Sequence, residues 1–269
     1  MLSQDEKIDI YSVAMALSDV ARATILPLFR TGNLRTENKL SVGYDPVTVA
    51  DKSAEKAMRD ILALRRPNDA VMGEEYDTTT GTSGLTWVLD PIDGTRGFVS
   101  GTPTWGVLIA VTDETGPLFG VIDQPFMGER FIGGFDWANY AGPHDTCKLS
   151  TRATTVLSAV TLFTTFPEVG RDRDKAGFQA VASQVQLVRY GMDCYAYALL
   201  ALGQIDLVIE AGLNAYDIQA PIAVIQAAGG LVTDWQGQPA HSGGQALAAA
   251  NPACHQAALA LLRPFADPR

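Results

Sequence analysis

Cysteine is scarce in this chain of 269 residues, and the few copies exclude a disulfide framework. The three cysteines are odd in number and lie far apart: Cys147, Cys194 and Cys254. Proteins that depend on disulfides carry more cysteines at closer spacing, and no pair here has the short spacing of a zinc site. The three histidines form no motif. We therefore expect a reducing compartment and a cytoplasmic location.

Long apolar runs and clusters of basic residues are also missing. No apolar run approaches the roughly 20 residues that span a bilayer, and the polar, acidic segment 1–9 is unlike a signal peptide. The net charge is −10 and no run of Lys or Arg appears, so we expect neither a membrane nor a nucleic-acid partner. An acidic protein that binds an anionic substrate would need bound cations to correct the local charge.

The composition predicts a folded protein with a sizeable core, since 47% of residues are hydrophobic and 19% are charged. The length suits one large domain or two of ordinary size. The segment 136–150 turns polar and contains Gly-Pro, so we place a boundary there. We expect residues 1–146 to form an α+β half and residues 147–269 to form an α/β half, in which strands and helices alternate.

Apolar periodicity places the elements of the two halves. In the first half we expect helices over 5–29 and after Asp51, a loop over 30–45, and strands over 47–50, 70–73, 87–89, 105–111, 118–123 and 130–133. In the second half we expect strands over 156–163, 185–189, 205–210, 231–234 and 247–250, and helices over 175–183, 194–202, 217–228 and 252–262.

The strongest chemical signal is the run from Trp87 to Phe98, which reads WVLDPIDGTRGF. A buried strand delivers one carboxylate, Asp90, to its end, and a second, Asp93, follows three residues later. Gly94 lets the backbone approach a ligand closely. Two carboxylates beside free backbone donors suit a divalent cation bridged to a phosphate. The spacing D-x-x-D differs from the D-x-D of phosphatases with an aspartyl nucleophile, which favours metal ligands and a water nucleophile.

Other acidic residues stand at element ends, where a structural reading competes with a functional one. Asp51 and Asp217 each begin a helical pattern, and taken alone each would be read as an N-cap worth about 1 kcal/mol. Glu74 follows a short strand next to Glu75, and adjacent carboxylates repel unless a cation separates them or one faces solvent. A solvated acidic turn is the alternative there.

Two further carboxylates are candidates for contacts with the rest of the substrate. Glu210 ends an apolar strand and points to the same loop region as Asp217. Asp193 begins the preceding helix, where capping is the alternative reading.

These elements together resemble the inositol monophosphatase family. The matching residues are Gly73-Glu74-Glu75, the run from Asp90 to Thr95, Tyr216-Asp217, and Ala228-Gly229-Gly230. The resemblance implies a Mg-dependent, lithium-sensitive phosphatase. It also implies a layered αβαβα architecture of the inositol monophosphatase/fructose-1,6-bisphosphatase type, with the site between two halves, and commonly a homodimer.

Within that family the chain looks most like the histidinol-phosphate phosphatase branch, which acts in histidine biosynthesis. This likeness rests on three segments: 122–125 with Glu129-Arg130, 193–198 and 210–213. Tyr216 stands where inositol monophosphatases usually have Trp, and this departure lowers the odds of an inositol phosphate substrate.

The resemblance implies two or three Mg²⁺ ions held by a defined set of ligands. The ligands would be the carboxylates of Glu74, Asp90, Asp93 and Asp217 and the backbone carbonyl of Ile92. The resemblance reverses the preference for a cap at both Asp51 and Asp217.

The remaining matches imply roles in catalysis and in binding. Asp51 matches an acidic position near a third metal and its water, and with Glu74 and Thr95 it would form the catalytic set. Asp93, Gly94 and Thr95 would hold the phosphate. Asp193 and Glu210 would bind the amine and imidazole of histidinol phosphate.

The sequence therefore predicts hydrolysis of a small phosphate monoester by metal-activated water, with histidinol phosphate as the preferred substrate. Inositol 1-phosphate and a 3′(2′),5′-bisphosphate nucleotide are the alternative substrates, and the second is disfavoured because no basic cluster is present for another phosphate. A non-catalytic cation-binding protein is the alternative from another class. The presence of Glu74 and Thr95 argues against it, because a structural site need not hold a water.

Overall fold

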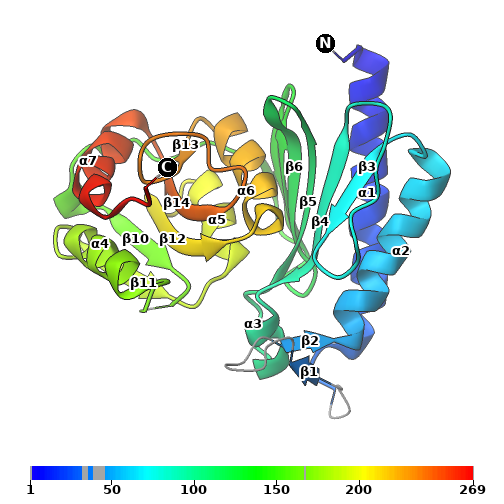
Figure 1. Ribbon diagram of the computed structural model, residues 1–269, viewed down its shortest axis with the longest axis horizontal. Helices are drawn as coiled ribbons and strands as arrows, with labels where there is room; N and C mark the ends of the chain where they lie inside the picture. Colours follow the sequence, from blue (N-terminus) through cyan, green and yellow to red (C-terminus); the bar gives the residue numbers. More distant parts are fainter. Residues whose placement is uncertain (1, 32–35, 39–45, 167, 269) are drawn as a thin grey trace.

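The computed structural model describes residues 2–31, 36–38, 46–166 and 168–268 and consists of stacked layers of helices and sheets (Figure 1). The first layer contains α1 (Gln4–Ile25) and α2 (Val49–Arg65). Both helices cover one face of a seven-stranded sheet. The opposite face of that sheet packs against α5 (Cys194–Ala201) and α6 (Ala215–Ala227).

The seven-stranded sheet holds all but one of the predicted metal ligands near one end. Its order is β3-β4-β5-β6-β7-β8-β9, where β3 is parallel to β4 and every other pair is antiparallel. The bounds are Ala70–Gly73, Thr86–Asp93, Gly106–Asp113, Gly116–Gln124, Glu129–Gly134, Trp137–Ala141 and Thr146–Lys148. On β5, Ile109 packs with α1 and α2, whereas Leu108 faces the core that contains α5 and α6.

The second sheet has the order β11-β10-β12-β14-β13. Its strands are β10 (Thr161–Thr164), β11 (Leu187–Tyr190), β12 (Leu207–Leu213), β13 (Leu231–Thr233) and β14 (Gly244–Ala249). One face packs on α5 and α6, and the other packs on α4 (Asp172–Ala182) and α7 (Pro252–Leu262). This arrangement confirms the predicted layered α/β fold.

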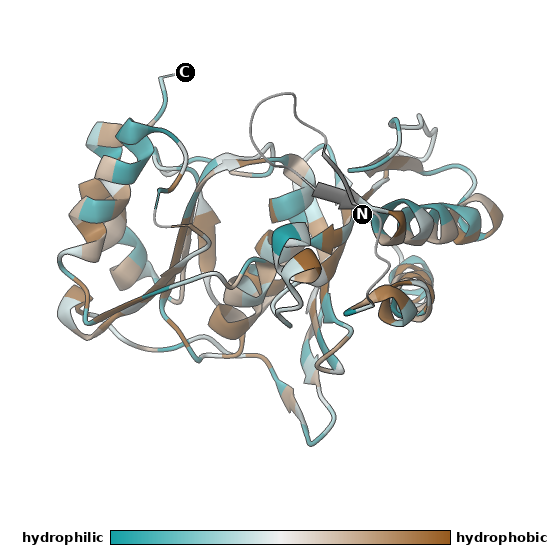
Figure 2. Ribbon diagram, turned by 90° about the horizontal axis from the view of Figure 1, so that it is seen from below, coloured by the Kyte–Doolittle hydropathy of each residue, from teal (hydrophilic) through white to brown (hydrophobic). Residues whose placement is uncertain are grey.

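Short elements complete the described chain. They are α3 (Thr95–Ser100), the antiparallel pair β1 (Thr36–Asn38) and β2 (Pro46–Thr48), and single 3₁₀ turns over Leu26–Leu28, Leu157–Ala159 and Arg263–Phe265. Figure 2 shows the outer helices banded in hydrophilic and hydrophobic residues, as helices with one buried face require. No helix in the described part of the chain is long and apolar enough to cross a bilayer.

Several predicted elements differ from the structure. The strand predicted over 156–163 is a 3₁₀ turn followed by β10, and Val156 is 57% exposed. Much of the loop predicted over 30–45 lies outside the described residues, but 36–38 forms β1. The segment 136–150, which we read as a polar boundary, contains β8 and β9. Burial alternates along β8, where Ala138 and Tyr140 are buried and Asn139 and Ala141 are exposed, as in a half-buried strand. Strand β9 therefore spans the predicted boundary at 146/147.

Helix α6 approaches the first sheet so closely that one strand position must be glycine. A Cβ atom on Gly133 of β7 would lie 2.4 Å from the Cα atom of Val224 in α6. That distance is shorter than real Cβ contacts, and both partners are backbone, so neither can rotate away. The close approach fixes how α6, and with it Asp217, sits against the sheet.

Substituting Gly133 with alanine should therefore destabilise the protein. We expect G133A to lower the free energy of unfolding by about 1–3 kcal/mol, as overpacking of a tight interface does. The measurement is urea unfolding followed by circular dichroism. A141V enlarges an exposed position of the neighbouring strand β8 and should change stability by less than about 0.5 kcal/mol. Equal stability of G133A and the parent would contradict the close packing.

Candidate active site

The two central carboxylates lie where β4 breaks its pairing with β5. The strands pair from Thr86 through Asp90, and pairing resumes only at Asp93, with a register shift between. Pro91 lies within the shift and has no N–H to donate to a ladder. The Ile92 N–H donates to Asp90 Oδ1 at 3.0 Å. The irregularity brings both carboxylates to one end of the sheet, as the D-x-x-D spacing suggested.

Glu74 reaches the same place because β3 runs parallel to β4. The last paired residues are Gly73 and Leu89, and the Glu74 N–H donates to the Leu89 carbonyl at 3.2 Å. The charge of Glu74 and a hydrogen bond with it are among the causes that raise the pKa of Asp90. The carboxyl ends of neighbouring parallel strands meet at one edge, so Glu74 and Asp90 lie together.

Asp51 enters the site from the first turn of α2, but it is not the N-cap that the sequence suggested. Thr48 is the cap, and Asp51 is the third helical residue of a capping box. Its Oδ2 accepts from the Thr48 N–H at 2.8 Å, while the Thr95 hydroxyl lies 3.4 Å from its Oδ1. The same hydroxyl donates to the Ile92 carbonyl at 3.1 Å. Thr95 thus links Asp51 to the Asp90–Asp93 turn.

Asp217 comes from the second half of the chain and occupies an equivalent position. Asn214 caps α6, and Asp217 is the third residue of its capping box, so the N-cap reading was wrong here too. The Asn214 N–H donates to Asp217 Oδ2 at 2.6 Å. Carboxylate oxygens of Asp90, Asp93 and Asp217 all lie within 4.8 Å of one another. The structure therefore brings together carboxylates that are more than 120 residues apart in sequence.

Gly94 starts the turn into α3 and has no room for a side chain. Its φ of +85° lies in the left-handed region, and a Cβ there would lie 2.7 Å from Asp193 Cγ. The backbone of the predicted phosphate-binding turn therefore touches Asp193, which belongs to the other half.

Asp193 and Glu210, the predicted substrate-binding residues, lie in the same cleft. Asp193 is the N-cap residue of α5, with a φ of +46°, but its side chain makes no capping hydrogen bond. The Thr104 hydroxyl donates to its Oδ2 at 3.3 Å. Glu210 is buried, and it accepts from the Thr165 N–H at 2.6 Å and from the Thr164 hydroxyl at 3.1 Å.

The electrostatics of the acidic cluster favour protonation or a bound cation. Burial raises the pKa of Asp90 well above its usual value, and the charges of Glu74, Asp93 and Asp217 add to the effect. The pKa of Asp93 is raised by burial and then by Asp193 and Asp217. Carboxylates at such short range cannot all stay ionised without a positive partner.

The pKa values of the flanking carboxyls are also raised, chiefly by burial. The pKa of Asp51 rises to about 6, although hydrogen bonds from Thr48 oppose the shift. The pKa of Asp193 rises to about 6 against a hydrogen bond from Thr104 and the charge of Arg96. The pKa of Glu210 rises to about 7 against its two threonine hydrogen bonds.

The donor set fits a hard divalent cation. The predicted ligand atoms are carboxylate oxygens and the Ile92 carbonyl, which is the chemistry that Mg²⁺ and Ca²⁺ prefer. Oxygens bound to one Mg²⁺ lie at most about 4.2 Å apart, twice the usual bond length. The 4.8 Å limit among Asp90, Asp93 and Asp217 is close to this value, so small side-chain rotations would place all three on one ion.

These residues line a cleft of about 280 Å³ between the two halves. The cleft also contains residues that the sequence did not suggest: Arg96, Phe166 and Tyr197. Arg96 directly follows the D-P-I-D-G-T run, and Tyr197 lies four residues after Asp193, on the same face of α5. The position of each residue close to a predicted site residue could have identified it from the sequence. Phe166 lies in a loop, and nothing in its local sequence marks it.

The residues that suggested the histidinol-phosphate branch divide between two places. Asp193 and Glu210 line the cleft, whereas Asp123, Glu129 and Arg130 are not among its lining residues. Asp123 is fully buried and accepts hydrogen bonds from Arg22 and Arg130, each at 2.6 Å. This second group joins α1 to the sheet and has a structural role.

Comparison with known proteins agrees with the geometry. The model of the inositol monophosphatase family matches residues 6–265. A chloroplastic bifunctional phosphatase of Arabidopsis thaliana is 40% identical over 240 residues, which cover 88% of this chain and 67% of the relative. A histidinol-phosphatase of Mycobacterium tuberculosis is 33% identical over 246 residues, which cover 89% of this chain and 93% of the relative.

Among solved structures, an inositol monophosphatase from Zymomonas mobilis superposes with a TM-score of 0.83 at 35% identity, covering 97% of this chain and 99% of that one. Family match, relatives and fold agree over almost the whole chain, which therefore belongs to the inositol monophosphatase family and is a phosphomonoesterase.

Proposed function

We propose that this phosphatase hydrolyses histidinol phosphate, a step of histidine biosynthesis, with Mg²⁺ as cofactor. The observation that carries the reaction class is the convergence of Asp90, Asp93 and Asp217, with their carboxylate oxygens within 4.8 Å of one another. The substrate proposal rests on Asp193 and Glu210, which line the same cleft, and on the histidinol-phosphatases among the relatives.

Each residue of the cluster has a defined task in this proposal. Asp90, Asp93 and Asp217 would hold one ion, and Glu74 and the Ile92 carbonyl would complete the set of ligands for the ions. Bound Mg²⁺ supplies Lewis-acid chemistry, because it neutralises phosphate charge and lowers the pKa of water.

The catalytic set would orient the attacking water and the phosphate. The Thr95 hydroxyl already lies between Asp51 and the Ile92 carbonyl, so it can present a water in line with the phosphorus. Glu74 would help to orient this water, Asp51 would accept its proton, and the leaving alkoxide would take up a proton from solvent. The backbone N–H groups of Gly94 and Thr95 would hold the phosphate together with Asp93.

The charge of the cleft favours a substrate with a cationic tail. Apart from the metal ligands, Asp193 and Glu210 face the cleft, and Arg96 is the one basic residue among its described lining residues. A 3′(2′),5′-bisphosphate nucleotide would bring a second dianion to this surface, so it fits poorly. Inositol 1-phosphate remains the second candidate, because the Zymomonas mobilis inositol monophosphatase is 35% identical. Family membership sets aside a purely structural cation-binding role.

From the same resemblance we propose two or three ions in each site, inhibition by lithium, a cytoplasmic location and a homodimer. We also retain the division into halves 1–146 and 147–269. In that division the first half supplies most metal ligands, and the second supplies Asp217 and the specificity residues.

The substrate proposal is tested by comparing histidinol phosphate with inositol 1-phosphate in the presence of Mg²⁺. We expect kcat/KM to be at least about tenfold higher for histidinol phosphate, the value of one well-placed charge interaction. E210Q should raise KM for histidinol phosphate with little change in kcat. E114Q, at an exposed turn, is the matched control. Faster turnover of inositol 1-phosphate by the parent enzyme would overturn the substrate assignment.

The metal-ligand assignment is tested with D93N. The amide keeps the shape of the side chain but weakens its affinity for a cation, so kcat should fall by at least about a thousandfold. Without metal, the melting temperature of D93N should equal or exceed that of the parent, because one of the repelling charges is gone. D60N on the exposed face of α2 is the control. An active D93N would show that the site is elsewhere.

Without metal, the stability of the protein should depend on pH, because burial raises the pKa values of the carboxyls in and around the cluster. Raised pKa values mean that the folded state binds protons more tightly than the unfolded state, so the free energy of unfolding should rise as pH falls. For Asp51, Asp193 and Glu210 the values are about 6, 6 and 7. Between pH 7.5 and 5.5 the gain in EDTA should be roughly 1–3 kcal/mol.

The control for this titration is the same experiment with saturating Mg²⁺, which should remove the part of the trend that comes from the proposed metal-binding carboxylates. His255 opposes the gain, because burial lowers its pKa, but it is one group against several carboxyls. A metal-free protein that loses stability from pH 7.5 to 5.5 would contradict the proposed cluster.

A further inference from the structure

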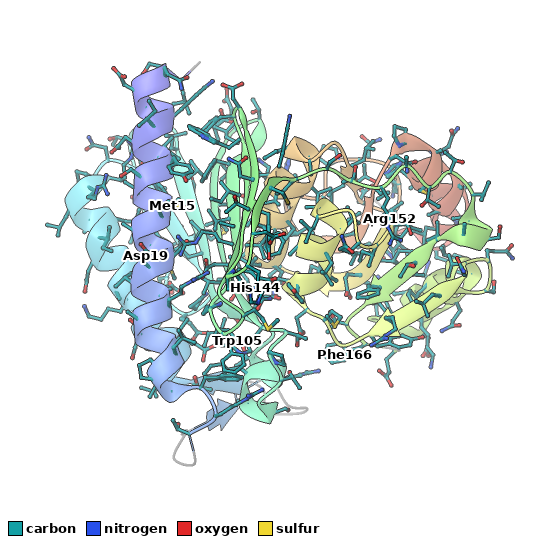
Figure 3. The ribbon with its side chains drawn as sticks, turned by 180° about the vertical axis from the view of Figure 1, so that it is seen from behind. Met15, Asp19, Trp105, His144, Arg152 and Phe166 are labelled. Carbon is teal, nitrogen blue, oxygen red and sulfur yellow. The ribbon has the colours of Figure 1, made fainter. Side chains whose placement is uncertain are left out.

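Phe166 and Arg96 meet at the opening of the active-site cleft, although they come from different halves. Arg96 lies in the first turn of α3, and Phe166 follows β10. The Arg96 guanidinium carbon lies over the Phe166 ring, 4.9 Å from its centroid. Figure 3 places Phe166 at the edge of the second half that faces α3. Both residues line the cleft.

The cleft changes in character from its floor to this opening. Asp90 is 2% exposed and Glu210 is 6% exposed, so these two carboxylates lie deep, whereas Asp93, Asp193 and Asp217 are partly exposed. Phe166 is 42% exposed, and Arg96 is exposed as well. A single exposed phenylalanine needs no explanation by itself. Its position does, because an apolar ring borders a cleft whose walls are mostly polar and acidic.

The contact with Arg96 shows what the ring face can bind. A guanidinium is a planar cation, and such groups are attracted to the negative face of an aromatic ring. An imidazolium has the same charge and is also planar. It can therefore take the place that the guanidinium occupies on Phe166.

We propose that Phe166 is a specificity-determining residue that binds a planar cationic or aromatic ring on the alcohol side of the phosphate ester. The inference rests on the proposed function, since histidinol phosphate carries such a ring. With the phosphate held at the Asp90–Asp93 turn, three carbon atoms separate the ester oxygen from the imidazole. The amine then falls beside the carboxylates of Asp193 and Glu210, and the ring reaches the opening.

The test compares two variants on two substrates. F166L removes the aromatic face but keeps apolar bulk, and F166Y keeps the face. The substrates are histidinol phosphate and 2-aminoethyl phosphate, which has the phosphate and the amine but no ring. We expect F166L to raise KM for histidinol phosphate about tenfold, within the range of cation–π contacts, with kcat within about twofold. F166Y should behave like the parent, and 2-aminoethyl phosphate should be hydrolysed equally by all three.

Phe126 provides a matched control. It is 44% exposed and carries its own cation–π contact, with Arg30 at 4.5 Å, but it does not line the cleft. F126L should leave both substrates unaffected. Inhibition by the product histidinol gives a reading that needs no turnover, and its inhibition constant should also rise about tenfold in F166L only.

The outcomes separate this inference from the proposed function. The decisive quantity is the ratio of kcat/KM for histidinol phosphate to kcat/KM for 2-aminoethyl phosphate. If F166L leaves this ratio unchanged, the ring-binding role is overturned. An equal loss on both substrates is one such result, and it would mean that Phe166 only orders the site. If the parent enzyme prefers inositol 1-phosphate but F166L still lowers the ratio, the proposed function fails and the role of Phe166 stands.

Discussion

The structure depends on holding like charges together at the junction of its two sheets. Asp90, Asp93 and Asp217 present oxygens within 4.8 Å of one another, and Asp90 is almost completely buried. Such a cluster is unfavourable without a cation, because burial and mutual repulsion both oppose ionisation. The rest of the fold must therefore supply the free energy that keeps the cluster assembled. A bound divalent cation would relieve the repulsion, and the same cation is needed for the proposed chemistry.

Helix α6 is the element whose packing offsets this unfavourable free energy. It lies between the two sheets, and residues 218–225 are all buried, so it has no solvent-exposed stripe over that stretch. It contacts β7 at van der Waals distance through Gly133. A helix buried on both sides cannot shift without losing packing against both sheets. Asp217 lies in the first turn of this helix and is therefore held opposite Asp90 and Asp93. A surface helix would hold it less rigidly.

Local pattern was sufficient for the fold class and for the Asp90–Asp93 turn, whereas Asp51 and Asp217 were selected only through the resemblance to the family, because each alone reads as a helix cap. The run from Asp90 to Thr95 and the short strand before Glu74 can each be recognised from a few neighbouring residues. The sequence was insufficient where the signal is a contact between distant segments. Arg96 and Phe166 are 70 residues apart, and no periodicity links them. Strand β8 was missed for another reason: its alternation was outweighed by the polar composition around it.

The capping-box position of Asp51 and Asp217 is compatible with the catalytic and metal-binding roles that we propose for them. Both occupy the third position of a capping box, and in both one oxygen accepts the N–H of the cap residue, at 2.8 and 2.6 Å. That hydrogen bond orients the carboxylate, so that the other oxygen of Asp51 meets Thr95. A side chain held in this way loses little further entropy when it binds an ion. The helix start therefore does not compete with the proposed site, because the capping-box hydrogen bond orients the carboxylate.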